Sequence, residues 1–545
     1  MFLRIAFVWA LAVTGSSWQS STTTGSISGT VQEKAHSGKP IAGAGVHVSP
    51  GGKSAETNAN GHYQIKDLAA GTYSVKVHLH GVGGPQGAKV VQISSGQDLA
   101  VDFQLLPMGR ISGRVVDETG EPAPGVGVFL IAREYRLGSL RYVYARFAQT
   151  DDRGQYELTN IESGRAYLIE ATKRIQKLNS NSDLPADFRL RRNTAIPTWY
   201  PDSDSPEGAQ ALALQPGEHR EGMEIRMRRS VSYCMDGVLS SDTGPDALEF
   251  WLEESEPTSG ESGEGNGVFL SLPSGKAGPD GKIRVCDLHP GTYRLLAMDS
   301  DWDSKGAPMF FGEMQFSIRD KDLHDVRVVG HGRIAVAGEI VWDAKPPEQL
   351  VSGKLSVSLR PMTRAPFMQE IGAGEVESSV PGQFTFLLLL TDDYVVKLMH
   401  VPPGAYVKDV VYGGLSALHA SMRVGKTMGS DLRVVLAHDG GTLNVKVADK
   451  DGNPIPDCQV VLLPAEASTE VMAADTMIKG QTDQYGTYSS GSIAPGKYFV
   501  LATNSSVDRT PESLEKLLLS RTHAREAELP PNGSVQIVLS PIELE

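Results

Sequence analysis

The stretch that decides the fold reads Gly154-Gln-Tyr156-Glu-Leu158-Thr-Asn-Ile161-Glu-Ser-Gly164-Arg-Ala-Tyr167. Its two glycines lie ten residues apart, and an aromatic residue follows each of them closely. Because related segments recur along the chain, the sequence is built from repeated units. The other segments begin at Gly61, Gly281, Gly382 and Gly486, and Asp392 replaces the second glycine in the segment at 382.

Each part of this pattern has a physical reason. The first glycine closes a turn that opens with Thr150-Asp151, where a positive φ is expected. Alternating apolar residues such as Tyr156 and Leu158 then direct one strand face inward. The second glycine makes the next turn, and the tyrosine after it begins another strand. Such a tyrosine can bury its ring and hydrogen-bond its hydroxyl to the turn.

A second signature lies upstream of the pattern, as in Ile111-Ser-Gly-Arg-Val115 followed by a polar turn and the strand after Gly125. A further strand, such as Val101-Asp-Phe103-Gln-Leu105, ends each unit. About seven short strands per roughly 100 residues predict a two-sheet sandwich. No long linkers separate the units, so we expect neighbours to touch and the chain to form an elongated rod or arc. The predicted units are 25–108, 109–229, 230–329, 330–439 and 440–545.

These motifs resemble the carboxypeptidase regulatory-like domain, in the multi-repeat form found in bacterial proteins. Repeats 1, 2 and 5 match the pattern well, repeat 3 matches it in part, and repeat 4 is degenerate. The resemblance implies an all-β chain, a tandem array of about five small prealbumin-like (transthyretin-like) β-sandwich modules with a carbohydrate-binding-like fold. It implies a non-catalytic role, because the family takes its name from a module attached to the peptidase.

The first 20 residues differ from the rest. Arg4 precedes an apolar run over 5–13, and small and polar residues follow, so residues 1–20 are predicted to be a signal peptide. The run is too short to span a bilayer, and we expect no membrane span in the mature chain. The formal net charge of −14 argues against nucleic acid as a partner. The chain is therefore expected to be exported to a periplasmic, outer-surface or extracellular location.

The motifs that resemble catalytic, phosphate-binding or metal-binding sites are all incomplete in this sequence. His523-Ala-Arg-Glu526 matches half of a zinc peptidase site, but no histidine follows it. It falls in a predicted short helical insert near the C-terminus, Thr510 to Leu529, with Thr510 as N-cap. A loose phosphate-loop match over 420–427 leads into a predicted strand, and the calcium-like Asp449-Lys-Asp451-Gly-Asn453 lacks its later ligands. We predict no catalytic residue, no cofactor and no metal site.

Two of the three cysteines, Cys234 and Cys286, fall on predicted neighbouring strands of repeat 3. In an exported protein they are candidates for a disulfide, and the alternative is a pair of reduced core thiols. Cys458 has no partner within its own repeat and is predicted to be a buried small hydrophobe.

One region is basic within this acidic chain. Residues 133–192 contain 12 Arg and Lys against 8 Asp and Glu. The candidate ligand surface is an aromatic and basic hairpin that could bind an anionic glycan or envelope polymer. The alternative is a long strand pair with a solvated face and some core aromatics. The candidate residues are Arg136, Arg141, Tyr142, Tyr144 and Arg146.

These observations favour an exported, non-catalytic repeat protein that acts as a scaffold or binding module at the cell envelope, with a polysaccharide or an envelope protein as partner. The alternative is an accessory module that works in trans with an outer-membrane transporter or surface enzyme. Both hypotheses rest on the fold class, which is a weaker basis than an identified site.

Overall fold

The computed structural model describes most of the chain between residues 24 and 544. The predicted signal peptide, residues 1–20, lies outside the described residues. Within the described part, no helix is long and apolar enough to cross a membrane. The ranges that are not described are 1–23, 35–37, 80–86, 137, 174, 177–193, 242–247, 255–268, 271–273, 279, 300–309, 348–353, 362–373, 426–430 and 545.

Strands make up nearly all of the regular structure, which confirms the all-β prediction. The first module contains β1 (Gly25–Glu33), β2 (Gly45–Ser49), β3 (Ser54–Glu56), β4 (His62–Leu68), β5 (Gly71–His78), β6 (Gly87–Ile93), β7 (Asp98–Ala100) and β8 (Phe103–Leu105). The second contains β9 (Gly109–Val116), β10 (Gly127–Arg136), β11 (Ser139–Gln149), β12 (Gln155–Ile161), β13 (Ala166–Thr172), β14 (Ile175–Gln176), β15 (Thr194–Ala195), β16 (Thr198–Trp199), the short 3-10 helix η1 (Pro206–Gly208), β17 (Leu212–Ala213), β18 (His219–Arg226) and β19 (Arg229–Ser230).

The remaining modules repeat this arrangement. The third contains β20 (Tyr233–Ser241), β21 (Leu248–Glu254), β22 (Phe269–Leu270), β23 (Ser274–Lys276), β24 (Lys282–Leu288), β25 (Gly291–Asp299), β26 (Phe310–Ile318) and β27 (Leu323–Gly332). The fourth contains β28 (Ile334–Trp342), β29 (Lys354–Pro361), β30 (Gly374–Ser379), β31 (Gly382–Leu389), β32 (Asp392–Met399), β33 (Tyr406–Tyr412), β34 (Leu415–Ser416), β35 (Met422–Val424) and β36 (Leu432–Ala437). The fifth contains β37 (Thr442–Val447), β38 (Gln459–Pro464), α1 (Glu470–Thr476), β39 (Ile478–Gln481), β40 (Thr487–Ser489), β41 (Gly496–Thr503), α2 (Pro511–Leu519), the 3-10 helix η4 (Ser520–His523), β42 (Arg525–Leu529) and β43 (Ser534–Leu539).

One topology is shared by all five modules. The first strand pairs antiparallel with the strand that follows the first glycine of the repeat and parallel with a strand from the end of the module. The second sheet is built on an antiparallel pair, such as β10 with β13 or β38 with β41. In the third module β26 also pairs with β27, so that its strands form one seven-stranded sheet. The exact ends of the predicted units stay predictions.

Each module buries its own apolar core, as expected when every strand directs alternate side chains inward. The five cores draw on residues within 27–105, 111–227, 235–328, 336–436 and 443–537.

The tyrosine after the second turn plays the predicted part in every module. Its hydroxyl donates to a backbone carbonyl of the preceding turn, and this pins the strand that follows to the turn. The fourth module keeps the bond although Asp392 replaces the glycine, so the degenerate repeat retains the fold. The donor and acceptor pairs are Tyr73 and Ala69 (2.9 Å), Tyr167 and Glu162 (3.2 Å), Tyr293 and His289 (2.9 Å), Tyr394 and Leu390 (3.1 Å), and Tyr498 and Ala494 (2.7 Å).

The structure explains why the Ile-Ser-Gly signature contains a glycine, which the sequence pattern alone did not explain. A Cβ at Gly113 would lie 1.8 Å from the carbonyl oxygen of Met223 on the neighbouring β18. That same carbonyl accepts the hydroxyl hydrogen bond of Tyr156 at 3.0 Å. The first module repeats the arrangement at Gly29. The glycine therefore lets the last strand approach closely enough to bond the core tyrosine.

The helical insert begins as predicted and ends earlier. The Thr510 side chain caps α2 by accepting a hydrogen bond from the amide of Ser513, and Pro511 occupies the first turn. The helix ends at Leu519, and residues 525–529, predicted as helical, form β42 instead. A second helix, α1, was not predicted from the sequence. Both helices pack against the fifth module's second sheet through a separate apolar cluster.

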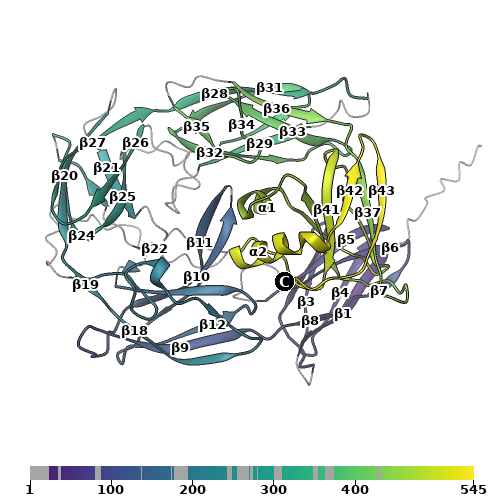
Figure 1. The fold of residues 1–545 in the computed structure, drawn as a ribbon, viewed down its shortest axis with the longest axis horizontal. Helices are drawn as coiled ribbons and strands as arrows, with labels where there is room; N and C mark the ends of the chain where they lie inside the picture. Colours follow the sequence, from purple (N-terminus) through teal and green to yellow (C-terminus); the bar gives the residue numbers. More distant parts are fainter. Residues whose placement is uncertain are drawn as a thin grey trace, which may run out of the picture.

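The five modules close into a ring, so the expected rod or arc is wrong. Figure 1 shows the fifth module, in yellow, lying beside the first, in purple, with α1, α2 and the β10–β11 hairpin inside the ring. Contacts of the fifth module with both the first and the second close it. Short linkers constrain only successive modules, and the sequence pattern held no information about contacts between distant modules.

Candidate functional site

The β10–β11 hairpin carries the predicted ligand surface and reaches into the ring (Figure 1). Tyr142 and Tyr144 are half-buried on the face of this sheet that points away from the module's main core. Tyr144 lies 4.9 Å from the ring of Phe129, and Tyr142 lies 6.3 Å from that of Trp199, measured between centroids. The two tyrosines are thus part of an aromatic cluster rather than freely exposed stacking groups.

The structure separates Arg146 from these tyrosines. A bulge makes Leu130 pair with Arg146 and Ile131 with Tyr144, so the simple alternation along β11 is broken. Arg146 is directed toward β12, where its Nε donates to the carbonyls of Thr159 at 3.1 Å and Asn160 at 2.7 Å. Its guanidinium therefore links the two sheets of the module.

The other two candidate residues lie toward the hairpin tip. Arg141 is half-buried, and in the strand register its backbone lies opposite that of Glu134 across the hairpin. Arg136 ends β10, and its side chain lies outside the described residues. The role of this face in ligand binding stays a prediction.

The hairpin's other role is to hold the fifth module. The Tyr135 side chain packs against the apolar cluster of α1 and α2, and its amide donates to the carbonyl of Arg509 at 2.7 Å. A hydrogen bond to Glu470, together with burial, raises the pKa of the Tyr135 hydroxyl to about 12. Arg133 pairs with Glu512 of α2 at 2.5 Å. Apolar and polar contacts together fix module 2 against module 5.

Arg165 links modules 2 and 5 at this junction. Its guanidinium bonds Glu134 and lies 3.6 Å from the carboxylate of Glu162 and 3.7 Å from that of Asp508 in the fifth module. The side chains of Arg165 and Glu134 are only 22% and 15% exposed, so water screens their interaction weakly. One cation therefore neutralises carboxylates from two modules.

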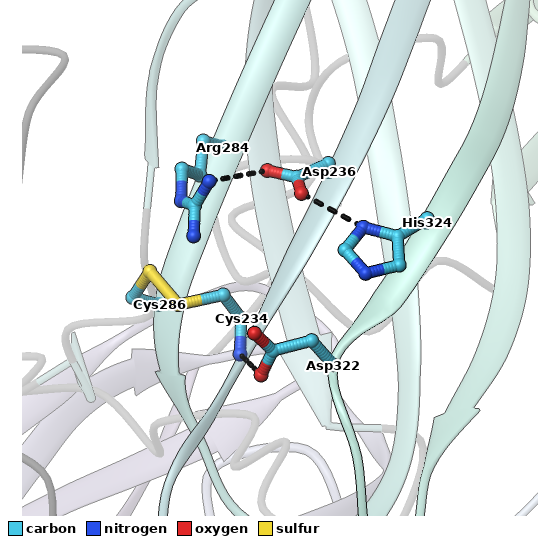
Figure 2. The surroundings of a disulfide bond; sticks show 6 residues. All are labelled: Cys234, Asp236, Arg284, Cys286, Asp322 and His324. Carbon is cyan, nitrogen blue, oxygen red and sulfur yellow. Dashed lines mark hydrogen bonds and ion pairs between the residues drawn. A yellow bond between two sulfur atoms is a disulfide. The ribbon is translucent and has the colours of Figure 1, made fainter.

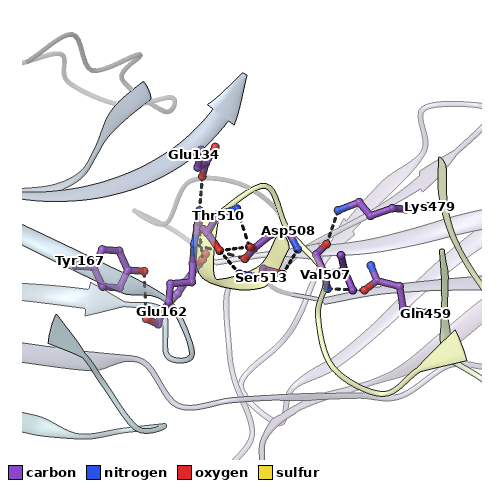
Figure 3. Close-up of polar contacts among 10 residues, drawn as sticks. Glu134, Glu162, Tyr167, Gln459, Lys479, Val507, Asp508, Thr510 and Ser513 are labelled. Carbon is purple, nitrogen blue, oxygen red and sulfur yellow. Dashed lines mark hydrogen bonds and ion pairs between the residues drawn. The ribbon is translucent and has the colours of Figure 1, made fainter. Parts of the chain in front are cut away.

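A cavity of about 600 Å³ opens beside this junction, where modules 2, 4 and 5 meet. Lys479 lies at its wall, and its ammonium donates to the carbonyl of Val507 at 2.5 Å (Figure 3). Burial lowers the pKa of Lys479. The acidic and basic side chains that line the cavity are Glu134, Arg165, Lys397, Asp475, Lys479, Asp508 and Arg509, and His419 lines it too.

The contact between modules 1 and 5 is polar. Lys89 of β6 pairs with Asp457 at 2.6 Å. Gln92, on the same strand, bonds Asp483 at 2.9 Å and exchanges hydrogen bonds with Gln484. Because such pairs are partly exposed, each contributes little by itself.

Modules 3 and 4 are joined by ion pairs and by apolar contacts. The carboxylate of Glu313 on β26 lies 2.8 Å from Arg423 of β35 and 3.4 Å from Arg294 of its own module. Leu390 of the fourth module packs with three buried side chains of the third, which are Leu296, Met298 and Phe311.

The first module is the part of the chain that matches a known family. Residues 26–106 match the family model of the carboxypeptidase regulatory-like domain. This match confirms, for that module, the resemblance that the motifs implied. The other four modules share the strand pairing of the first module, and the family match itself covers residues 26–106. No curated protein matches the chain.

Some solved structures align with parts of the chain. The minor pilin of the Gram-positive pathogen Streptococcus agalactiae shares 12% identity, with 38% of this chain and 96% of the pilin covered and a TM-score of 0.23. A streptococcal ancillary pilin shares 13%, with 57% and 99% covered and a TM-score of 0.20. The major pilin subunit of Bacillus cereus shares 11%, with the same coverage and a TM-score of 0.15. Scores this low carry no argument about function.

Cys234 and Cys286 form a disulfide between β20 and β24 (Figure 2). The amide of Cys234 also donates to Asp322 at 2.9 Å. Close by, Asp236 lies 3.5 Å from Arg284 and 2.9 Å from His324, so that it links three neighbouring strands. Cys458 is fully buried, as predicted.

One arrangement of side chains was not anticipated. Ser112 Oγ lies 3.2 Å from Nε2 of His219, whose Nδ1 lies 3.4 Å from the carboxylate of Glu221. A catalytic nucleophile, its histidine base and a carboxylate that orients the base can be linked in this order. The Glu221 side chain is 72% exposed, however, and water weakens its hold on the imidazole. These contacts are those of a polar sheet surface.

The motifs set aside in the sequence lie on ordinary elements. His523 ends η4 and Glu526 lies in β42, and the Asp449 segment is a turn in which Asp449 accepts from the amides of Asp451 and Asn453. Of the phosphate-loop match, 422–424 is a strand and 426–430 lies outside the described residues. Among the residues that the structure describes, no group of three or more His, Cys, Asp or Glu could hold a metal ion.

Proposed function

We propose that this protein is an exported, non-catalytic scaffold whose ring holds five β-sandwich modules at fixed relative positions, with a binding surface for an envelope polysaccharide or protein. The observation that carries the proposal is the double contact of the fifth module with the first and the second. A ring closed in this way holds the surfaces of its modules at fixed relative positions, and preorganisation reduces the entropy lost on binding.

The basic residues of the second module support an anionic partner. Arg141 is the candidate contact because it lies toward the tip of the basic hairpin. A partner in trans, such as a transporter or surface enzyme, is the alternative, and co-purification of a specific protein would favour it.

Co-sedimentation with envelope fractions and with insoluble polysaccharides at low and high salt tests the proposal. We expect the chain to be retained on one of these materials, and Arg141→Ser to weaken retention severalfold at low salt. The matched control is Arg114→Ser, because Arg114 is exposed on the other sheet of the same module, paired with Glu224. Absence of retention on every fraction, or equal loss in both variants, would contradict the proposal.

A further inference from the structure

The cavity of about 600 Å³ at the junction of modules 2, 4 and 5 has two chemically different walls. Its volume falls within the range of small-ligand sites in proteins. Among the described residues of the lining, those of modules 2 and 5 all carry charged side chains. Module 4 contributes every apolar side chain of the lining, and these are Val395, Val396, Leu418 and Ala420.

Each of the three carboxylates in this lining already has a partner within the protein. Glu134 and Asp508 both face the guanidinium of Arg165, with Asp508 Oδ2 3.7 Å from the Arg165 Nε. Asp475 accepts a hydrogen bond from the backbone amide of Gly138 at 2.9 Å. The acidic groups of the cavity therefore do not require a bound cation.

Two cations of the same lining, Lys479 and Arg509, donate to backbone carbonyls instead. The Lys479 ammonium bonds the carbonyl of Val507 at 2.5 Å, and the Arg509 Nε bonds that of Ala474 at 2.9 Å (Figure 3 shows the first of these bonds). Neither cation forms an ion pair with a carboxylate among the described residues, and both residues are exposed. Because an ammonium has three donors and a guanidinium five, each has donors left for a ligand.

The electrostatics of this wall favour an anion. Burial lowers the pKa of Lys479 most strongly, and the neighbouring guanidinium of Arg509 adds to this effect, while Asp508 opposes it. An anion beside both cations would relieve their repulsion and replace the hydration that the Lys479 ammonium has lost. Because the lining has four Lys and Arg side chains against three carboxylates, one negative charge balances it.

We propose that this cavity binds a small organic acid, with its carboxylate at Lys479 and Arg509 and its apolar body against the module 4 wall. The charge of the lining selects a monoanion, and the contrast between the walls selects an amphiphilic one. The proposal does not rest on retention by envelope material, because Arg141 does not line the cavity and a free ligand tests the site.

Isothermal titration calorimetry of the full chain with hexanoate, 1-hexanol and acetate tests both parts of the site without any substitution. Hexanol keeps the apolar body and lacks the charge, whereas acetate keeps the carboxylate and lacks most of the apolar body. We expect saturable binding of hexanoate and at least tenfold weaker binding of each of the other two. No saturable binding of hexanoate, or equal affinity for hexanol or for acetate, would overturn the proposal.

Two variants of the fifth module test the cations. Lys479→Gln and Arg509→Gln each remove one charge and keep a hydrogen-bond donor, and we expect each to weaken hexanoate binding at least fivefold. The matched control is Lys446→Gln, because Lys446 is exposed on the other sheet of this module, and we expect its affinity to stay within twofold of the wild type. Unchanged affinity in either cavity variant, or an equal loss in the control, would overturn the assignment. If a variant does not fold, the three ligands on the wild-type chain decide.

Discussion

Replacing Cys234 and Cys286 by serine together lowers the free energy of unfolding of the third module by about 4 kcal/mol, because the disulfide closes a loop between residues 52 positions apart. We expect the loss to be concentrated in β20 and β24, the two strands that the disulfide joins. Hydrogen exchange measures it locally, as faster exchange of the amides of these strands under conditions where other modules are unaffected.

Two controls and one independent measurement test this prediction. The wild type under reducing conditions should reproduce the behaviour of the double variant, whereas Cys458→Ala should leave exchange in β20 and β24 unchanged. If mass spectrometry of the unreduced protein found free thiols at both Cys234 and Cys286, the disulfide would be absent and the prediction wrong.

Arg165→Met is expected to weaken the junction between modules 2 and 5 by about 2 kcal/mol. The substitution removes the Arg165 guanidinium from Glu134, which is 15% exposed, and from Asp508 and Glu162. Breaking a buried pair in this way costs more than the pair contributes as a whole, and partial exposure reduces the effect here. Faster hydrogen exchange in β10 and α2 measures the loss.

The controls for this prediction separate charge from packing. Adding Glu134→Gln to Arg165→Met removes the carboxylate with which Arg165 paired, and we expect more than half of the stability to return. Arg114→Met breaks the exposed pair with Glu224 and should cost less than about 1 kcal/mol. An equal cost for Arg114→Met and Arg165→Met would show that the junction does not depend on the buried pair.

The module fold was predictable because its determinants are local. Gly164 and Tyr167 lie within a few residues of the turn that they stabilise, so a short pattern contains the information. Helix α2 was predicted from its cap, Thr510, for the same reason. Helix α1 was missed, although its cap Thr469 accepts a hydrogen bond from the amide of Met472 in the same way.

Ring closure was not predictable, because it depends on contacts between residues far apart in the chain. Lys89 and Asp457, for example, are separated by 368 positions. The candidate site was only partly predictable for a related reason. The register shift between Leu130 and Ile131 moved Arg146 away from Tyr144, and Trp199, which packs with Tyr142, joins the sheet from a later segment.

Small-angle X-ray scattering of the purified chain tests the closed ring most directly. Five modules of roughly 100 residues have a radius of gyration of about 30 Å when they close on themselves and of about 50 Å when they lie in a row. The account predicts a value close to 30 Å at low salt, with Arg165→Met giving a larger one. A wild-type value close to 50 Å would contradict ring closure and, with it, the proposed scaffold.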